Sequence, residues 1–197
     1  MTKEYENYID RYLQEVALIC SLIDKKEITR LAQKIKDIKE KAGRLFVFGV
    51  GGSAANASHA VNDFRKILGI ETYSAFDNVS ELTARINDDG WDSSLVEWLK
   101  VSRLTTNDTI LILSVGGGSE TTSQNLVHVM KYAKSLGAST CAVVSRDGGC
   151  AKKICDLCVL VPVVDEERIT PHAEEWQAIL WHMIVSCVAS TKGAHEN

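Results

Sequence analysis

Two hydrophobic patterns follow one another along the chain. In residues 3–24 and 27–41 apolar side chains recur every three or four positions, which predicts two amphipathic helices before any strand. Short, continuous apolar runs come next, and segments with helical spacing separate them. Such runs are typical of strands buried on both faces of a parallel sheet. The runs lie at 44–50, 70–76, 109–115, 139–145 and 157–163.

The alternation of these elements predicts an α/β fold with a five-stranded parallel sheet flanked by helices. A chain of 197 residues, 45% of them hydrophobic, suits a single domain over 1–197. We expect N-terminal helices over 1–43, an α/β sandwich over 44–191 that ends in a long helix, and a tail over 192–197. The helices within the sandwich are expected at 53–67, 78–86, 92–102, 119–135, 148–155 and 172–191.

Charge and composition exclude several classes of partner. With 22 basic and 26 acidic residues, the chain lacks the basic excess of a nucleic-acid-binding protein. The charged N-terminus does not resemble a signal peptide, and no apolar run approaches the roughly 20 residues of a membrane span. We therefore expect a cytoplasmic protein without a membrane or nucleic-acid partner.

Cysteines offer one candidate metal or redox motif. Cys150, Cys155 and Cys158 form a C-x4-C-x2-C pattern, but a zinc site of this kind usually needs a second pair of ligands. The second half of the pattern also lies in an apolar run that reads as a buried strand. Reduced structural thiols are therefore the favoured interpretation.

Two glycine loops follow predicted strands, at 49–55 ("GVGGSAA") and 114–120 ("SVGGGSE"). Ligands of parallel sheets bind beyond the carboxyl ends of the strands, so both loops can reach one ligand. The first loop matches a loose dinucleotide fingerprint, but that match does not explain the second loop. Serine hydroxyls and backbone N–H groups at two helix N-termini favour a compact sugar phosphate. The candidate contacts are Gly51, Gly52, Ser53, Ser114, Gly117 and Ser119.

Two pairs of ionisable residues lie behind these loops. His59 and Asp63 are four residues apart and share a helix face, and Glu174 and His182 lie two turns apart on the last predicted helix. Imidazole and carboxylate groups are the side chains that remove and supply protons next to a carbonyl. The same groups are ligands for zinc and other divalent metals.

The chain resembles the sugar isomerase (SIS) domain family, and within it the phosphoheptose isomerases, which convert sedoheptulose 7-phosphate. The matching segments are "GVGGSAANASH" (49–59), "INDDG" (86–90), "ILSVGGGS" (112–119), "RDGG" (146–149) and "EEWQAILWH" (174–182). The resemblance implies a homotetramer with active sites at subunit contacts and no nucleotide cofactor. It implies that Asp63 is the base and His182 the acid, with His59 and Glu174 lining the same site. In some relatives these four positions bind zinc.

The resemblance also suggests substrate contacts and reveals departures from the family. Asn87 and Asp88 match a substrate-side loop, and His172 is a candidate for the substrate pocket. The family usually has glutamate at position 63, and the aspartate here is about 1.5 Å shorter, a misplacement that can cost on the order of 100-fold in rate. The family usually has glutamine where Glu174 stands.

Two alternatives follow from these departures. Either Glu174 is the base, or His59, Asp63, Glu174 and His182 together chelate zinc or another divalent metal. The second glycine loop also lacks two hydroxyls that relatives carry, at Val115 and Gly116. The phosphate is therefore expected to rest on backbone N–H groups, Ser53, Ser114 and Ser119.

The sequence thus predicts an aldose–ketose isomerase acting on a sugar phosphate, with sedoheptulose 7-phosphate and a heptose 7-phosphate as the expected pair. The alternative is a non-catalytic SIS-type regulator that senses a sugar phosphate or binds a protein.

Overall fold

A five-stranded parallel sheet forms the centre of the fold, with strand order β2-β1-β3-β4-β5, in a computed structural model that describes residues 2–191. The strands are β1 (Leu45–Phe48), β2 (Thr72–Tyr73), β3 (Thr109–Leu113), β4 (Ser139–Val144) and β5 (Leu157–Leu160). The predicted α/β class and the parallel sheet are confirmed. The tail predicted over 192–197 lies outside the described residues.

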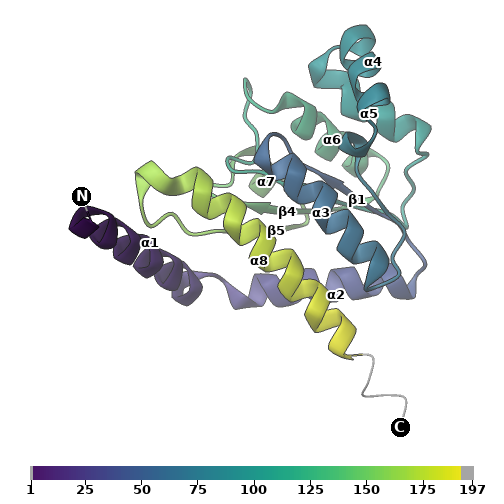
Figure 1. The fold of residues 1–197 in the computed structure, drawn as a ribbon. Helices are drawn as coiled ribbons and strands as arrows, with labels where there is room; N and C mark the ends of the chain where they lie inside the picture. Colours follow the sequence, from purple (N-terminus) through teal and green to yellow (C-terminus); the bar gives the residue numbers. More distant parts are fainter. Residues whose placement is uncertain (1, 192–197) are drawn as a thin grey trace.

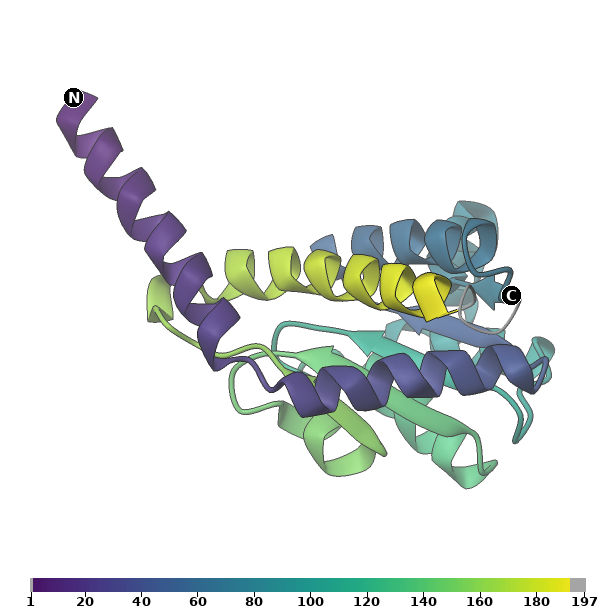
Figure 2. The same ribbon diagram turned by 90° about the horizontal axis from the view of Figure 1, so that it is seen from below.

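Helices cover both faces of the sheet (Figure 1). One face packs against α2 (Lys25–Glu40), α3 (Gly52–Lys66) and α8 (Ile169–Ser190). The other face packs against α5 (Trp91–Val101), α6 (Gln124–Ser135) and α7 (Gly149–Ile154). Helix α4 (Val79–Asp89) packs on α5. Helix α1 (Thr2–Leu22) extends away from the rest of the molecule (Figure 2).

The continuous apolar runs are explained by burial on both faces. Along β1, Leu45 and Val47 belong to the core beneath α2, α3 and α8. Phe46 and Phe48 belong to the core beneath α5 and α6. Successive side chains of a strand point to opposite faces, so a strand covered on both sides must be apolar at every position.

Two predicted elements differ most in their bounds. The second strand is only two residues long, and a 3-10 helix (Ala75–Asp77) occupies the end of the predicted run. Helix α6 begins at Gln124 and not at 119, because Gly117 and Gly118 adopt φ angles of 71° and 78° and the chain turns before the helix can start. These differences place a longer loop after β3 than the sequence predicts.

All six cysteines are free thiols, and none lies in a group suited to metal binding among the described residues. Burial raises the pKa of Cys155 to about 12 and that of Cys158 to about 11. Thiols with such pKa values are poor nucleophiles and poor ligands at neutral pH. The geometry therefore agrees with structural thiols. Among residues 2–191, no helix is both long and apolar enough to cross a membrane.

A buried ion pair attaches α1 to the start of α8. The carboxylate of Glu15 accepts two hydrogen bonds of 2.8 Å from Arg168, and its Oε2 lies 2.9 Å from Nε2 of His172. Hydrogen bonding from Arg168, with a further contribution from His172, lowers the pKa of Glu15 from 4.5 to about 2. The ionised carboxylate is thus the form that holds the two helices together.

Removing this charge should weaken the protein in a pH-dependent way. We expect Glu15→Gln to lower the free energy of unfolding in urea by about 2 kcal/mol at pH 7. Because the pKa of Glu15 is depressed in the folded state, its contribution is present above pH 4.5 and is lost as the pH falls toward 2. The difference between wild type and variant should therefore shrink at pH 3. Glu6→Gln, on the exposed part of α1, is the control and should show no such difference.

Candidate active site

A cavity of about 700 Å³ opens at the carboxyl ends of the central strands. Four segments far apart in the sequence line it: the loop after β1, the loop after β3, the β4–α7 region and the first turn of α8. The lining residues are Val50, Ser53, Ser114, Val115, Gly116, Gly118, Ser119, Glu120, Thr122, Ser123, Arg146, Asp147, Gly149, Cys150, Lys153 and Thr170. Both glycine loops thus meet at one cavity, as the position of parallel strand ends predicts.

The second glycine loop is locked against the loop that follows β4. Ser114 Oγ accepts a hydrogen bond of 3.1 Å from the N–H of Gly117. The N–H groups of Cys150 and Ala151 donate to the carbonyls of Gly118 and Gly117, both at 2.9 Å. The N–H of Gly117 is therefore engaged within the loop in this structure, and its contact with phosphate stays a prediction. Gly117 packs against Gly148 and does not line the cavity.

The serines of the two loops have different surroundings. Ser53 is the second residue of α3, it is buried, and its Oγ accepts a hydrogen bond of 3.0 Å from Gln177 on α8. Ser119 does not begin a helix, contrary to prediction. Its Oγ instead accepts hydrogen bonds from the N–H groups of Thr121 and Thr122 within the loop. Both hydroxyls still line the cavity.

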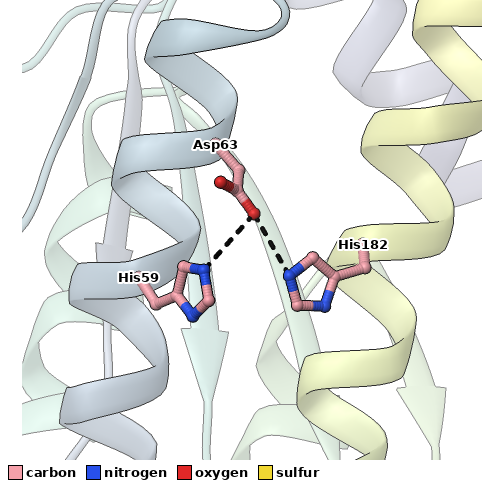
Figure 3. A group of neighbouring side chains, drawn as sticks. All are labelled: His59, Asp63 and His182. Carbon is pink, nitrogen blue, oxygen red and sulfur yellow. Dashed lines mark ion pairs between the residues drawn. The ribbon is translucent and has the colours of Figure 1, made fainter.

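His59, Asp63 and His182 meet between α3 and α8 (Figure 3). Oδ2 of Asp63 lies 3.7 Å from Nε2 of His59 and 3.3 Å from Nε2 of His182. The Nε1–H of Trp181 also donates to Oδ2, at 3.3 Å. The carboxylate is almost buried, with 11% of its side chain exposed, whereas about half of each imidazole is exposed. A fixed carboxylate thus lies behind two accessible imidazoles.

These three side chains could hold a metal ion. Their ligand atoms all lie within 4.8 Å of one another, and within the described part of the chain this is the one such group of histidine, cysteine or acidic residues. Ligand atoms placed tetrahedrally at ~2.0–2.2 Å from zinc are about 3.3 Å apart, close to the separations found here. Two imidazoles and one carboxylate also form a donor set that zinc accepts.

Glu174 lies away from this group. A Cβ atom built on Gly52 would be 2.4 to 2.7 Å from the carboxylate of Glu174, so the carboxylate rests on Gly52 at the start of α3. Eight residues separate Glu174 from His182, which is about 12 Å along a helix. The four-residue metal set expected from the sequence is therefore reduced to three in this structure. The carboxylate of Glu174 also explains why Gly52 is not in the lining of the cavity.

Four other candidates do not line the cavity. His172 is buried at the base of α1, with Nε2 2.9 Å from Glu15 and Nδ1 3.4 Å from Glu175. Asn87 and Asp88 are exposed at the end of α4, where the side-chain amide of Asn87 donates to Asp88 at 2.7 Å. Gly51 is exposed and likewise absent from the lining. Their roles as substrate contacts stay predictions, since the structure shows only that they do not line this cavity within one described chain.

Comparison with known proteins decides the family. The family model for the SIS domain matches residues 5–145. The chain belongs to the SIS domain family. This SIS protein is 28% identical to the phosphoheptose isomerase of Helicobacter pylori strain P12, over 96% of this chain and 100% of that protein. It is 30% identical to the phosphoheptose isomerase of Chlorobium phaeobacteroides, over 84% of this chain and 73% of that protein. These relatives support an isomerase.

Solved structures confirm the SIS fold. The phosphoheptose isomerase of Neisseria gonorrhoeae superimposes with a TM-score of 0.83 at 21% identity, covering 94% of this chain and 99% of that one. A phosphoheptose isomerase from Francisella tularensis gives the same TM-score at 17% identity, covering 96% and 98%. At sequence identities of 21% and 17%, this structural similarity supports the fold alone.

In this SIS domain, sequence reasoning misses the residues that join α3 to α8. The amide of Asn56 donates to the carbonyl oxygen of Glu174 and to Oε1 of Gln177, both at 2.9 Å. Gln177 is 1% exposed and donates onward to Ser53. Helical spacing is the signal that could have found them. Asn56 follows Ser53 by three residues and Gln177 follows Glu174 by three residues, so each shares a helix face with a candidate site residue.

Proposed function

We propose that this SIS protein interconverts the ketose and aldose forms of a sugar phosphate, with sedoheptulose 7-phosphate and a heptose 7-phosphate as the pair. One observation carries the proposal: the carboxylate of Asp63 is held between His59 and His182, on two helices that both begin at the glycine-loop cavity. The similarity to phosphoheptose isomerases supports the choice of a seven-carbon sugar. A non-catalytic regulator is less favoured, because it would need no such acid–base group.

The reaction requires a base for the proton next to the carbonyl and an acid for the carbonyl oxygen. Both groups must act on adjacent atoms of one substrate, so the base has to lie beside His182. Asp63 meets that requirement, and Glu174, about two turns away on α8, does not. We therefore assign the base to Asp63 and the acid to His182. Asn62 and Trp181 hold the carboxylate in place by hydrogen bonds of 3.0 and 3.3 Å.

The spacing along α3 fits a linear sugar with phosphate at one end. Ser53 lies in the cavity, and His59 follows it by six residues, a rise of about 9 Å. An open-chain sugar anchored by its phosphate at the cavity can therefore extend toward the imidazoles. The carboxylate of Glu174 rests on Gly52, next to Ser53, where it can accept hydrogen bonds from sugar hydroxyls.

An alternative form of the proposal places a divalent metal, zinc in the first instance, at His59, Asp63 and His182. In that form His182 is a metal ligand, and the metal would act on the carbonyl oxygen in place of the acid. When bound there, a metal would polarise the carbonyl as a Lewis acid. Glu174 is not needed as a ligand, and the three side chains leave a coordination position open, as catalytic zinc sites do.

Metal analysis tests this part of the proposal. Protein purified without added metal should carry close to one zinc per chain, and His182→Ala should lose most of it because one of three ligands is gone. His128→Ala, on α6 outside the group, is the control and should retain the metal. Metal-free protein whose turnover survives chelators would reject the metal.

A homotetramer with active sites at subunit contacts is also part of the proposal. Helix α1 exposes a series of large apolar side chains that a second copy could cover: Tyr5, Tyr8, Ile9, Leu13, Leu18 and Leu22. The half-exposed imidazoles are likewise open to a neighbouring subunit. Light scattering should give four times the chain mass. The free cysteines are in keeping with the cytoplasm as the proposed location.

A substrate panel tests the activity itself. Pentose, hexose and heptose phosphates are incubated with the protein, and interconversion is followed by chromatography. We expect the highest kcat/KM for sedoheptulose 7-phosphate and none for the sugar without phosphate. A folded protein that interconverts no member of the panel would contradict the proposal.

A further inference from the structure

Two cationic side chains line the cavity, and neither has an ionic partner. Arg146 belongs to the loop after β4 and Lys153 to α7, and both are lining residues. Among the ion pairs of residues 2–191, neither side chain takes part. By contrast, Arg44, Arg85 and Arg168 are each paired with carboxylates. Within residues 2–191, both cations of the cavity are therefore outside any ion pair and can face a bound anion.

Local backbone geometry brings Arg146 over the second glycine loop. Arg146 has a φ of 53°, in the left-handed region that side-chain-bearing residues rarely adopt. A Cβ atom built on Gly116 would lie 3.8 Å from Cδ of Arg146, so the arginine stem passes beside a residue without a side chain. The stem of Arg146 therefore lies against the second glycine loop.

Several backbone donors at this end of the cavity are already engaged. The N–H of Gly117 donates to Ser114, and the N–H groups of Cys150 and Ala151 in α7 donate to the carbonyls of Gly118 and Gly117. The charge of an anion can be met by the cationic side chains that line the cavity. Two carboxylates also line the cavity, but Asp147 is turned to the backbone, where it accepts from the N–H of Gly149 at 3.0 Å. The second, Glu120, is exposed, as Arg146 and Lys153 are, and no ion pair among the described residues joins it to either cation.

We propose that Arg146 and Lys153 together bind the phosphate dianion of the substrate, and that this charge pair replaces a hydroxyl-based phosphate loop. The guanidinium can donate two parallel hydrogen bonds to phosphate oxygens, and the ammonium adds a second point charge. Ser53, Ser114 and Ser119, which also line the cavity, then add hydroxyl contacts. The inference rests on the proposed function for the identity of the substrate, but not for the binding of phosphate as such.

Calorimetry with inorganic phosphate tests the pair without any turnover. We expect Arg146→Gln and Lys153→Gln each to weaken phosphate binding by about 10- to 100-fold, the usual effect of losing a hydrogen bond to a charged group. Arg146→Lys should recover part of the loss, because it keeps the charge without the planar fork. Lys152→Gln is the matched control: this neighbour is exposed, does not line the cavity and should bind phosphate like the wild type.

The KM, the kcat and the salt dependence of phosphate binding distinguish a binding role of Arg146 and Lys153 from a purely structural one. With the sugar phosphate, both Gln variants should raise KM by a similar factor and leave kcat within about threefold, since the interaction is the same in ground and transition states. Added NaCl should weaken phosphate binding by the wild type more than by the double variant.

The outcomes separate this inference from the proposed function. Phosphate binding that weakens in the two variants supports the pair even if no sugar phosphate is isomerised. Wild-type affinity for phosphate in both variants overturns the pair, even if the isomerase is active. Failure of the wild type to bind either phosphate or sugar phosphate also overturns it.

Discussion

Replacing Asp63 by asparagine should lower kcat for the sugar-phosphate isomerisation at least 100-fold. A side-chain base contributes typically 10²- to 10⁴-fold, and an amide does not accept the substrate proton. Asparagine has nearly the shape of aspartate and can still accept the hydrogen bond from Trp181, so the fold should be retained. The measurement is kcat with saturating substrate, accompanied by the melting temperature of the variant.

Glu174→Gln is the matched comparison, since it makes the same chemical change in the other candidate base. Its carboxylate rests on Gly52 and lies outside the His59–Asp63–His182 group, so we expect a rise in KM and a kcat within about tenfold of wild type. If Glu174→Gln abolishes turnover while Asp63→Asn retains it, the base is Glu174.

The second large effect is expected at Gly149, where two loops of the cavity touch. A Cβ atom there would lie 2.2 Å from the carbonyl oxygen of Gly116 and 2.4 Å from that of Gly118, and the residue has a φ of 52°. Gly149→Ala should therefore separate the loops and lower the free energy of unfolding by about 3 kcal/mol, from backbone strain and overpacking together. Phosphate binding should be lost with it.

Gly69→Ala separates the effect of backbone strain from the effect of overpacking between the loops. Gly69 has a similar φ of 67°, but a Cβ atom there meets nothing within 4 Å. It should cost only about 1 kcal/mol, the strain of a left-handed residue, and leave phosphate binding unchanged. Equal losses from both alanine variants in urea unfolding would show that loop contact contributes nothing at Gly149.

Much of the fold can be predicted from the hydrophobic pattern, because burial on both faces makes each parallel strand apolar throughout. The run at 109–115 contains β3, and every residue of that strand is buried. The pattern is less informative at 70–76, where only two residues pair with β1 and the chain then turns into a 3-10 helix. A short edge strand leaves too few buried positions to define its end.

The meeting of His59 and Asp63 on one helix face could be predicted from their spacing, because residues four apart lie one above the other on a helix. His59 and Asp63 share a face of α3, and the sheet places that face against α8, where His182 lies. Glu174 lies outside this group, because residues eight apart share a face of the helix but are about 12 Å apart along its axis. The spacing in the sequence shows which face of a helix a residue lies on. Which residues of α3 and α8 lie opposite one another depends on how the two helices pack.

The polar contacts that depend on packing could not be predicted. His172 belongs to the ion pair at the base of α1, because the fold brings Glu15 to it from 157 positions away. Arg146 and Lys153 lack any periodic signal, since their place in the cavity depends on how the β4–α7 loop meets the second glycine loop. Such contacts between distant loops leave no pattern in the sequence.

The most direct measurement of the proposed chemistry is proton NMR of sedoheptulose 7-phosphate with the protein in D₂O. The account predicts that an aldose heptose phosphate accumulates with deuterium at the carbon next to its carbonyl, and that Asp63→Asn abolishes both signals. An aldose signal without dependence on Asp63, or a folded wild-type protein that gives neither product nor deuterium exchange, would contradict it.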